Sequence, residues 1–101
     1  MRLGFIGAGN MAQAMIGGIL AKEIVKKEDI IASAATQKTI DKVAKEFGIN
    51  VTLDNREVAK ADIVFLAVKP FYYEEVIDAI KDVVDEKQLI ISVAAGKSVE
   101  W

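Results

Sequence analysis

A glycine-rich segment near the N-terminus carries the clearest chemical signal in this 101-residue chain. The run Gly7-Ala8-Gly9-Asn10-Met11-Ala12 has the spacing G-x-G-x-x-A and stands between a strand-like and a helix-like apolar stretch. In that setting the first glycine permits a tight turn, the second lets the backbone approach a pyrophosphate, and the alanine lets helix and strand pack closely. The free N–H groups that open the helix attract phosphate. The run therefore predicts a dinucleotide site; the alternative is a tight turn that binds nothing.

The second expected strand, Asp29–Ala35, indicates which dinucleotide is bound. It ends without the carboxylate that would hold the ribose 2′-hydroxyl of NAD. Glu28 and Asp29 stand at its other end, more than about 13 Å away at about 3.3 Å per residue. The donors near the site are Ser33, Thr36, Gln37 and Lys38. This pattern favours NADP(H), with NAD(H) possible at lower affinity. Thr36 could instead cap the next helix, and for Lys38 plain solvation is the preferred interpretation.

The composition excludes several classes of site and partner. There are 13 Lys and Arg against 15 Asp and Glu without a basic cluster, so we expect no nucleic-acid partner. The absence of Cys and His rules out disulfides, Ser-His and Cys-His catalytic pairs and the usual zinc sites within the chain, and we expect no metal. Since no apolar run approaches a membrane span and glycine comes too early for a signal-peptide core, we expect a cytoplasmic protein with no membrane contact.

Apolar periodicity predicts strands and helices in strict alternation. The expected strands are Arg2–Ile6, Asp29–Ala35, Asn50–Leu53, Asp62–Val68 and Gln88–Val93. Four helices are expected. The first, Met11–Ala21, is apolar almost all round, and the third is Arg56–Lys60. The second has an apolar face of Ile40, Val43, Ala44 and Phe47, and the fourth has an apolar stripe of Val76, Ile77, Ile80, Val83 and Val84. The alternation predicts an α/β, doubly wound parallel sheet (a Rossmann fold) of five strands in the order 3-2-1-4-5.

Several residues have structural interpretations. Thr36 is the expected N-cap and Gly48 the expected stop of the second helix. The two glycines of the first helix, Gly17 and Gly18, are expected to allow close contact of helix and sheet rather than to bind a ligand. The continuous apolar run at Ile63–Val68 is typical of a strand covered on both faces. Glu74 and Glu75 fall in the first turn of the last helix, where the helix dipole favours them; Tyr72 and Tyr73 are expected to pack.

Four stretches together resemble the pyrroline-5-carboxylate reductases, and the resemblance runs over the whole chain. They are Gly4-Phe5-Ile6-Gly7-Ala8-Gly9-Asn10-Met11-Ala12, Ala32-Ser33, Phe65-Leu66-Ala67-Val68-Lys69-Pro70, and Ser92-Val93-Ala94-Ala95-Gly96. The resemblance implies an NADPH-dependent oxidoreductase that transfers hydride to the C=N carbon of 1-pyrroline-5-carboxylate, giving L-proline in amino-acid biosynthesis.

The resemblance also implies cofactor-binding residues. The pyrophosphate would be lined by Ile6, Gly7, Ala8, Gly9, Asn10 and Met11. Ser33 would contact the ribose that carries the 2′-phosphate, and Asn55 would contact the adenosine side. The cofactor would be bordered by Ala67, Val68, Lys69 and Pro70, and its nicotinamide half would lie near Ala94, Ala95 and Gly96. Structural alternatives remain open for three of them. Asn55 could equally be an N-cap, Lys69 could be solvated, and Pro70 suits the first turn of a helix.

Family members continue into a helical C-terminal domain that supplies the proton donor, most of the substrate pocket and the dimer interface. We therefore expect residues 1–101 to be one dinucleotide-binding domain without a catalytic residue, inactive alone, whose parent forms a homo-oligomer and binds the imine through the missing domain. Gln88–Val93 would then be an exposed apolar edge that promotes self-association. The alternatives are a redox-sensing NADP(H)-binding module, or the first domain of a related NADP-dependent imine or hydroxyacid oxidoreductase.

Overall fold

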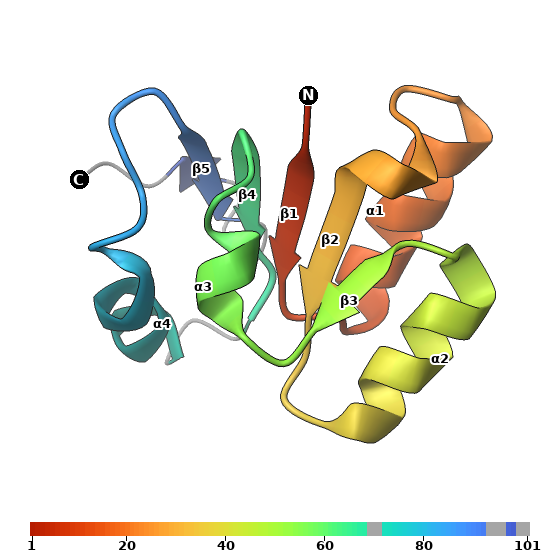
Figure 1. Cartoon of the computed structure of the whole chain (residues 1–101), viewed down its shortest axis with the longest axis horizontal. Coiled ribbons are helices and arrows are strands. Elements are labelled where there is room, and N and C mark those ends of the chain that lie inside the picture. The colour runs from red at the N-terminus through yellow and green to blue at the C-terminus, as the bar shows by residue number, and fades with distance from the viewer. Residues whose placement is uncertain (69–71, 93–96, 99–101) are drawn as a thin grey trace.

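The computed structural model describes residues 1–68, 72–92 and 97–98, and these form one sheet with helices on both faces (Figure 1). The elements in chain order are β1 (Leu3–Ile6), α1 (Asn10–Ala21), η1 (Lys27–Asp29), β2 (Ile30–Ser33), α2 (Gln37–Phe47), β3 (Asn50–Thr52), α3 (Asn55–Val58), β4 (Ile63–Leu66), α4 (Tyr73–Ile80), β5 (Leu89–Ser92) and β6 (Lys97–Ser98). The predicted α/β fold is confirmed: the first five strands are parallel, in the order β3-β2-β1-β4-β5.

The sheet has a sixth strand that the sequence did not predict. β6 runs antiparallel to β5, with Ile91 opposite Ser98 and Ser92 opposite Lys97. The prediction that Gln88–Val93 is an unpaired edge is therefore wrong at Ile91 and Ser92. A two-residue strand lacks the alternating pattern that marks a strand in a sequence, because its pairing is decided by the neighbouring strand alone.

The second helix shows how local sequence determines an element. Thr36 has extended backbone and its side chain accepts a hydrogen bond from the N–H of Thr39 at 3.3 Å, so it is the N-cap as predicted. Gly48 ends the helix in the left-handed region at φ 69°, a conformation that costs a residue with a Cβ free energy. Between them Ile40 and Val43 are buried, so the predicted apolar face of α2 is confirmed.

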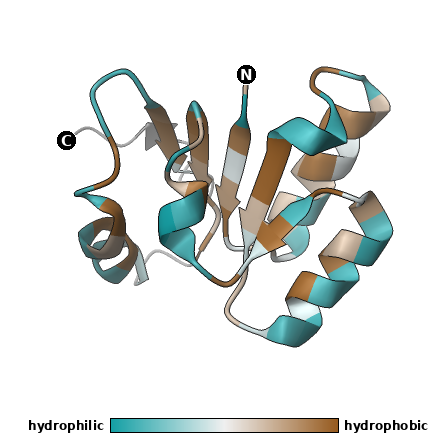
Figure 2. Ribbon diagram, viewed as in Figure 1, coloured by the Kyte–Doolittle hydropathy of each residue, from teal (hydrophilic) through white to brown (hydrophobic). Residues whose placement is uncertain are grey.

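Each face of the sheet has its own apolar core (Figures 1 and 2). On one face, α1 and α2 cover β1 and β2 with Ala12, Ile16, Val43 and Phe5 among the buried residues. On the other face, α3 and α4 cover β1, β4 and β5 around Val58, Val76, Ile80, Val64 and Ile90. The alternation of side chains along each strand places successive residues in different cores. This arrangement fixes where the carboxyl ends of β1, β2 and β4 lie relative to the helices that follow them.

Two predictions of complete burial are wrong. In α1 only Ala12 and Ile16 are buried, and Met11 is 56% exposed, because the helix presents one side to the sheet and the other outward. In β4 Val64 and Leu66 are buried, whereas Ile63 and Phe65 are only partly so. On the face of the sheet that carries α1 and α2, these two helices lie over β1 and β2. On the same face of β4 and β5, no helix of the described part of the chain covers the strands.

Candidate functional site

The turn after β1 requires a glycine at its first position. Gly7 has φ 97°, and a Cβ there would lie 2.9 Å from the carbonyl oxygen of Ala67 and 2.9 Å from Cγ1 of Val68. Its N–H donates to the carbonyl of Ser33 at 3.1 Å, which joins the turn to the end of β2. Gly7 therefore brings the ends of β1, β2 and β4 together, and any other residue would be strained and would clash with Ala67.

The second glycine of the motif has a different role. Gly9 is the N-cap of α1 with φ −76°, which most residues adopt easily, and a Cβ there would have no atom of the described chain within 4 Å. No side chain caps the helix, so the N–H groups of its first turn lack an intrahelical partner. Nothing in the packing requires glycine at this position. Open space next to unpaired N–H groups is what a phosphate needs in order to approach the backbone.

The remaining part of the motif is held by α1 itself. Ala12 is completely buried, as predicted for the small residue where helix and strand pack closely. Gln13, the one polar residue of this helix segment, donates from Nε2 to the carbonyl of Ala8 at 2.8 Å. This bond fixes the direction of the Ala8 carbonyl in the loop. Sequence reasoning assigned Gln13 no role, because its five-residue reach back to the loop depends on where the helix begins.

A cleft of about 380 Å³ opens beside the glycine turn. This volume is within the range of small-molecule and cofactor sites. The cleft lies between the end of β2, the start of α3 and the face of α4; its lining residues are Gly7, Ser33, Ala34, Ala35, Leu53, Asn55, Val68, Tyr72, Glu75, Val76 and Ala79. Four of the sequence-predicted cofactor residues, Gly7, Ser33, Asn55 and Val68, are thus brought together.

A hydrogen-bonded chain crosses the inner wall of this cleft. Ser33 is 0% exposed, and its hydroxyl donates to Oδ1 of Asn55 at 2.6 Å while it accepts a weaker bond from the N–H of Gly7 at 3.4 Å. The alternative that Asn55 is the N-cap of its helix is wrong. Asp54 is the cap: its Oδ1 accepts from the N–H of Arg56 at 2.9 Å, one residue earlier than expected. Because Oδ1 of Asn55 is engaged by Ser33, its amide group is left as a donor at the cleft.

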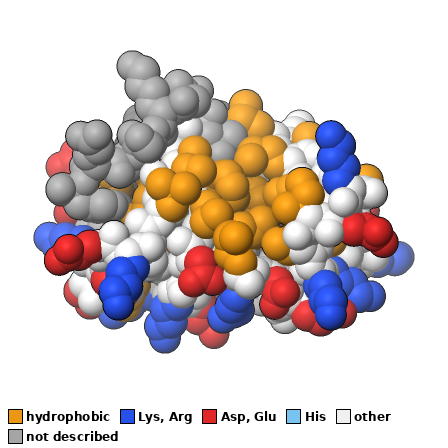
Figure 3. Space-filling view, turned by 90° about the horizontal axis from the view of Figure 1, so that it is seen from above, with side chains coloured by type: hydrophobic (Ala, Val, Ile, Leu, Met, Phe, Trp, Pro, Cys, Tyr) orange, Lys and Arg blue, Asp and Glu red, His pale blue; other side chains and the backbone are white. Residues whose placement is uncertain are grey.

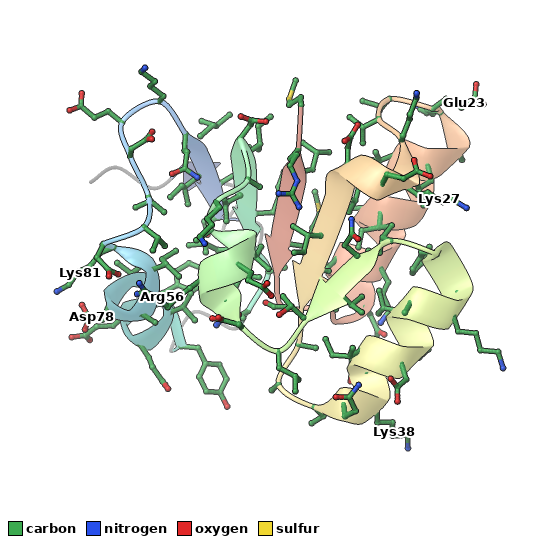
Figure 4. All side chains as sticks on the ribbon, viewed as in Figure 1. Glu23, Lys27, Lys38, Arg56, Asp78 and Lys81 are labelled. Atoms are coloured by element: carbon green, nitrogen blue, oxygen red, sulfur yellow. The ribbon has the colours of Figure 1, made fainter. Side chains whose placement is uncertain are left out.

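The two helices on this face are linked by an ion pair. Arg56, labelled in Figure 4, donates to both carboxylate oxygens of Asp82, at 2.6 and 2.9 Å. It also donates to the carbonyl of Ala79 at 3.0 Å. These hydrogen bonds lower the pKa of the Asp82 carboxyl and raise that of the Arg56 guanidinium. The pair is exposed, and it connects the start of α3, next to Asn55, with the end of α4. It therefore positions two walls of the cleft.

The ends of β4 and β5 are linked by the first residue of α4. The hydroxyl of Tyr73 lies 2.5 Å from Oγ of Ser92 and donates to the carbonyl of Leu66 at 3.4 Å. The ring packs against the core of that face, so the expectation of a packing role is confirmed for Tyr73. Tyr72 is different, since it is 45% exposed and lines the cleft. Sequence reasoning could not separate these two tyrosines, because Tyr72 precedes α4 and Tyr73 is its first residue, and a sequence pattern does not locate a helix end to one residue.

Other predicted residues fall into three groups. Ile6 and Ala8 are buried at the turn, Asn10 and Met11 are exposed at the start of α1, and Ala67 is half-buried after β4. Thr36 caps α2, and Lys38 points away from the body of the protein, as its solvated interpretation predicts (Figure 4). The remaining predicted residues lie outside the described part of the chain; they are Lys69, Pro70, Ala94, Ala95 and Gly96.

The expectation that the two helix glycines allow close contact of helix and sheet is wrong. A Cβ at Gly17 would make an ordinary contact with Phe47 of α2 at 3.6 Å, and one at Gly18 would meet nothing within 4 Å. Neither glycine therefore serves close contact between α1 and the sheet.

A larger hollow, of about 850 Å³, lies at the other end of the strands, near the starts of β1 and β2. It is lined by Met1, Leu20, Glu23, Ile24, Val25, Lys26, Lys27, Glu28, Asp29 and Phe47. Figure 4 labels two of them, Glu23 and Lys27, at the upper right of the view. Glu28 and Asp29 are thus remote from the end of β2, as predicted. No residue of the glycine motif lines this hollow, so it is separate from the candidate site.

Comparisons with known proteins point to one group. The model of the family described as "NADP oxidoreductase coenzyme F420-dependent" matches residues 2–96. A pyrroline-5-carboxylate reductase of Pseudomonas aeruginosa is 44% identical over 96 residues, 94% of this chain and 35% of that protein.

Solved structures agree with the sequence comparison. The pyrroline-5-carboxylate reductase of Coxiella burnetii has a TM-score of 0.85 at 35% identity, over 90% of this chain and 34% of that one. The pyrroline carboxylate reductase of Plasmodium falciparum, solved with NADP bound, has a TM-score of 0.77 at 32% identity, over 92% of this chain and 33% of that one. The chain therefore spans about a third of the length of these relatives. Among residues 1–68, 72–92 and 97–98, no helix is long and apolar enough to cross a membrane.

Proposed function

We propose a function from the premise that this chain belongs to the family described as NADP oxidoreductase, coenzyme F420-dependent. The chain is the NADP(H)-binding domain of a reductase that converts 1-pyrroline-5-carboxylate to L-proline. Its similarity to pyrroline-5-carboxylate reductases of 44% and 35% identity supports the substrate, and the NADP bound to the 32% identical relative supports the cofactor. We also propose the cytoplasm as its compartment.

The observation that carries cofactor binding is the contrast between the two loop glycines. Gly7 is required by the protein itself, since its backbone and its neighbours exclude a side chain. Gly9 is not, because a side chain there would enter open space at the unpaired N–H groups of α1. A dinucleotide explains both residues: its pyrophosphate would occupy the space at Gly9, and its adenosine half the neighbouring cleft of about 380 Å³.

Each wall of the site has a proposed role toward the cofactor. The N–H groups at the start of α1 would hold the pyrophosphate, and the amide of Asn55, oriented by the buried hydroxyl of Ser33, would donate to the adenosine ribose or its 2′-phosphate. Val68, at the end of β4, would border the cofactor. The nicotinamide, when bound, supplies the hydride for imine reduction; this chain's own residues bind and orient it.

We further propose that the imine is bound by a second, helical domain and that the complete protein is a homo-oligomer. The basis is the resemblance to the pyrroline-5-carboxylate reductases given above, of which this chain matches about a third of the length. The orientation of reactants contributes much of the rate of such reactions, so residues 1–101 are expected to bind cofactor without turning over 1-pyrroline-5-carboxylate. An NADPH-oxidation assay with that imine checks this, and turnover by the isolated chain would contradict it.

The cofactor assignment is tested by titrating the chain with NADPH and with NADH, followed by calorimetry or by nicotinamide fluorescence. We expect saturable binding of NADPH and weaker binding of NADH, because β2 ends at Ser33 without a carboxylate. Equal or tighter binding of NADH would contradict the NADP(H) preference. A chain that binds neither cofactor would overturn the proposed function.

A further inference from the structure

One carboxylate reaches the cleft from an element that the nucleotide motif does not include. Glu75 belongs to the first turn of α4 and is 42 residues beyond Ser33 in the sequence, yet both side chains line the same cleft of about 380 Å³. It is exposed, and no hydrogen bond or ion pair of its carboxylate is found within the described part of the chain. A ligand in the cleft would therefore be exposed to the charge of this carboxylate.

The charge of the cleft depends on this residue. Among the described residues that line the cleft, Glu75 is the only carboxylate and none is Lys or Arg. The nearest cation in sequence to the lining residue Asn55 is Arg56, whose guanidinium is held by Asp82 and by the carbonyl of Ala79. The described lining therefore carries one negative charge. A 2′-phosphate adds about two further negative charges to this space, whereas the 2′-hydroxyl of NAD adds none and can donate a hydrogen bond.

We propose that Glu75 is a specificity-determining residue, which weakens the binding of NADP(H) relative to NAD(H) through repulsion of the 2′-phosphate. This inference rests on the proposed function and deepens it. The absence of a carboxylate at the end of β2 favours NADP(H), and Glu75, brought in from α4, offsets part of that preference. Glu75 thereby reduces the difference between the affinities of the site for NADP(H) and NAD(H).

The adjacent Glu74 provides a matched control. Both glutamates are exposed and both stand in the first turn of α4, so each has the same favourable interaction with the helix dipole. Only Glu75 lines the cleft. The variants Glu75→Gln and Glu74→Gln therefore make the same change of net charge, side-chain size and helix-end electrostatics, and they differ in whether the lost charge faces the ligand.

The experiment measures the dissociation constants of NADPH and NADH for the wild type, Glu75→Gln and Glu74→Gln by calorimetry. We expect Glu75→Gln to bind NADPH about three- to tenfold more tightly, the effect of one charge at a solvent-open site, with NADH changed by less than about twofold. The gain should shrink at about 1 M salt, because the Debye length falls to about 3 Å. Glu74→Gln should bind both cofactors like the wild type.

Three outcomes are distinguishable from that pattern. If the wild type binds NADPH and the two variants have the same ratio of NADPH to NADH dissociation constants, the inference is wrong while the proposed function stands. If Glu75→Gln tightens NADH as much as NADPH, the carboxylate does not sense the 2′-phosphate, and the inference is again overturned. If the wild type binds neither cofactor, the proposed function and the inference both fail. Circular dichroism of the three proteins verifies that the fold is unchanged.

Discussion

The motif residues act for different physical reasons, although they stand within six positions of one another. Gly7 is required by its left-handed φ of 97° and by the closeness of Ala67. Ala12 is required by close packing, since it is completely buried. Gly9 satisfies neither condition, and its conformation suits any residue. A substitution at Gly9 can therefore separate ligand binding from folding, which a substitution at Gly7 cannot.

Replacing Gly9 by Val should remove NADPH binding and leave the protein folded. The branched side chain would fill the space that the pyrophosphate needs, so we expect affinity to fall more than about a hundredfold, or about 2.8 kcal/mol. Folding stability should fall by only about 1 kcal/mol, the usual effect of an unfavourable N-cap. Calorimetric titration and urea unfolding measure the two effects.

Gly18→Val is the matched control for this variant. Gly18 is exposed on α1, and a Cβ there also meets no atom of the described residues within 4 Å. It follows Gly9 by nine residues, which is about two and a half helical turns from the phosphate site. It should bind NADPH like the wild type. Normal binding by Gly9→Val would show that the glycine motif is only a turn.

At the scale of elements, the cleft depends on how α3 and α4 are held together. α3 has only four residues and could not be stable as an isolated helix. It is held by burial of Val58, by the Asp54 cap, and by the bidentate pair of Arg56 with Asp82 beyond the end of α4. An element this short takes its position from its partners, so the placement of Asn55 at the cleft is a property of the α3–α4 unit.

The contribution of the Arg56–Asp82 pair should depend on pH in a predictable direction. The pKa of Asp82 is lowered in the folded protein, first by its hydrogen bonds with Arg56, so the pair stabilises the fold above the ordinary value of 3.8. That stabilisation is lost as the pH falls through the lowered pKa. Asp82→Asn should therefore melt at a lower temperature than the wild type near pH 7, and the difference should vanish in strong acid.

Thermal melts of both proteins from about pH 7 to about pH 2 measure this difference. The effect should be small, and high salt should reduce it, because both groups are exposed to solvent. A difference in melting temperature that persists unchanged in strong acid would show that Asp82 stabilises the fold by some route other than its charge.

For the molecule as a whole, the helices of residues 1–68 and 72–92 leave one face of the sheet incompletely covered at β4 and β5. α1 and α2 lie over β1 and β2, whereas Ile63 and Phe65 of β4 are partly exposed and Leu89 of β5 is 48% exposed. The end of the molecule where the strands begin also carries a continuous area of hydrophobic side chains at its middle (Figure 3). Contiguous apolar surface of this kind is typical of contact with another polypeptide.

We expect the isolated chain to self-associate through the incompletely covered face of β4 and β5. The reason is the exposed apolar surface at Leu89 rather than a free strand edge, because β6 pairs with β5 at Ile91 and Ser92. Sedimentation velocity over a range of concentrations should show association of the wild type and a shift toward monomer for Leu89→Lys. Leu53→Lys, at a leucine 56% exposed beside the cleft, is the control and should associate like the wild type. A wild type that stays monomeric throughout would overturn this prediction.

Features that depend on a few neighbouring residues could be predicted from the sequence. Apolar periodicity predicted the five parallel strands and their order, because right-handed crossovers leave few other arrangements of alternating strands and helices. Thr36 and Gly48 predicted the ends of α2, since a cap and a left-handed stop each depend on a few adjacent residues. The glycine motif predicted where the chain turns toward its ligand.

Contacts between residues far apart in the chain could be seen only in the folded structure. The Ser33 hydroxyl contacts Asn55, Gln13 reaches the Ala8 carbonyl, and Glu75 lines the cleft, and none of these relations follows from spacing in the sequence. Burial likewise depends on what lies above an element: α1 is apolar almost all round and yet half exposed, because an apolar residue is buried only where a neighbouring element covers it. The hydrophobic effect favours the burial of every apolar side chain, but the positions of the helices over the sheet determine which side chains are buried.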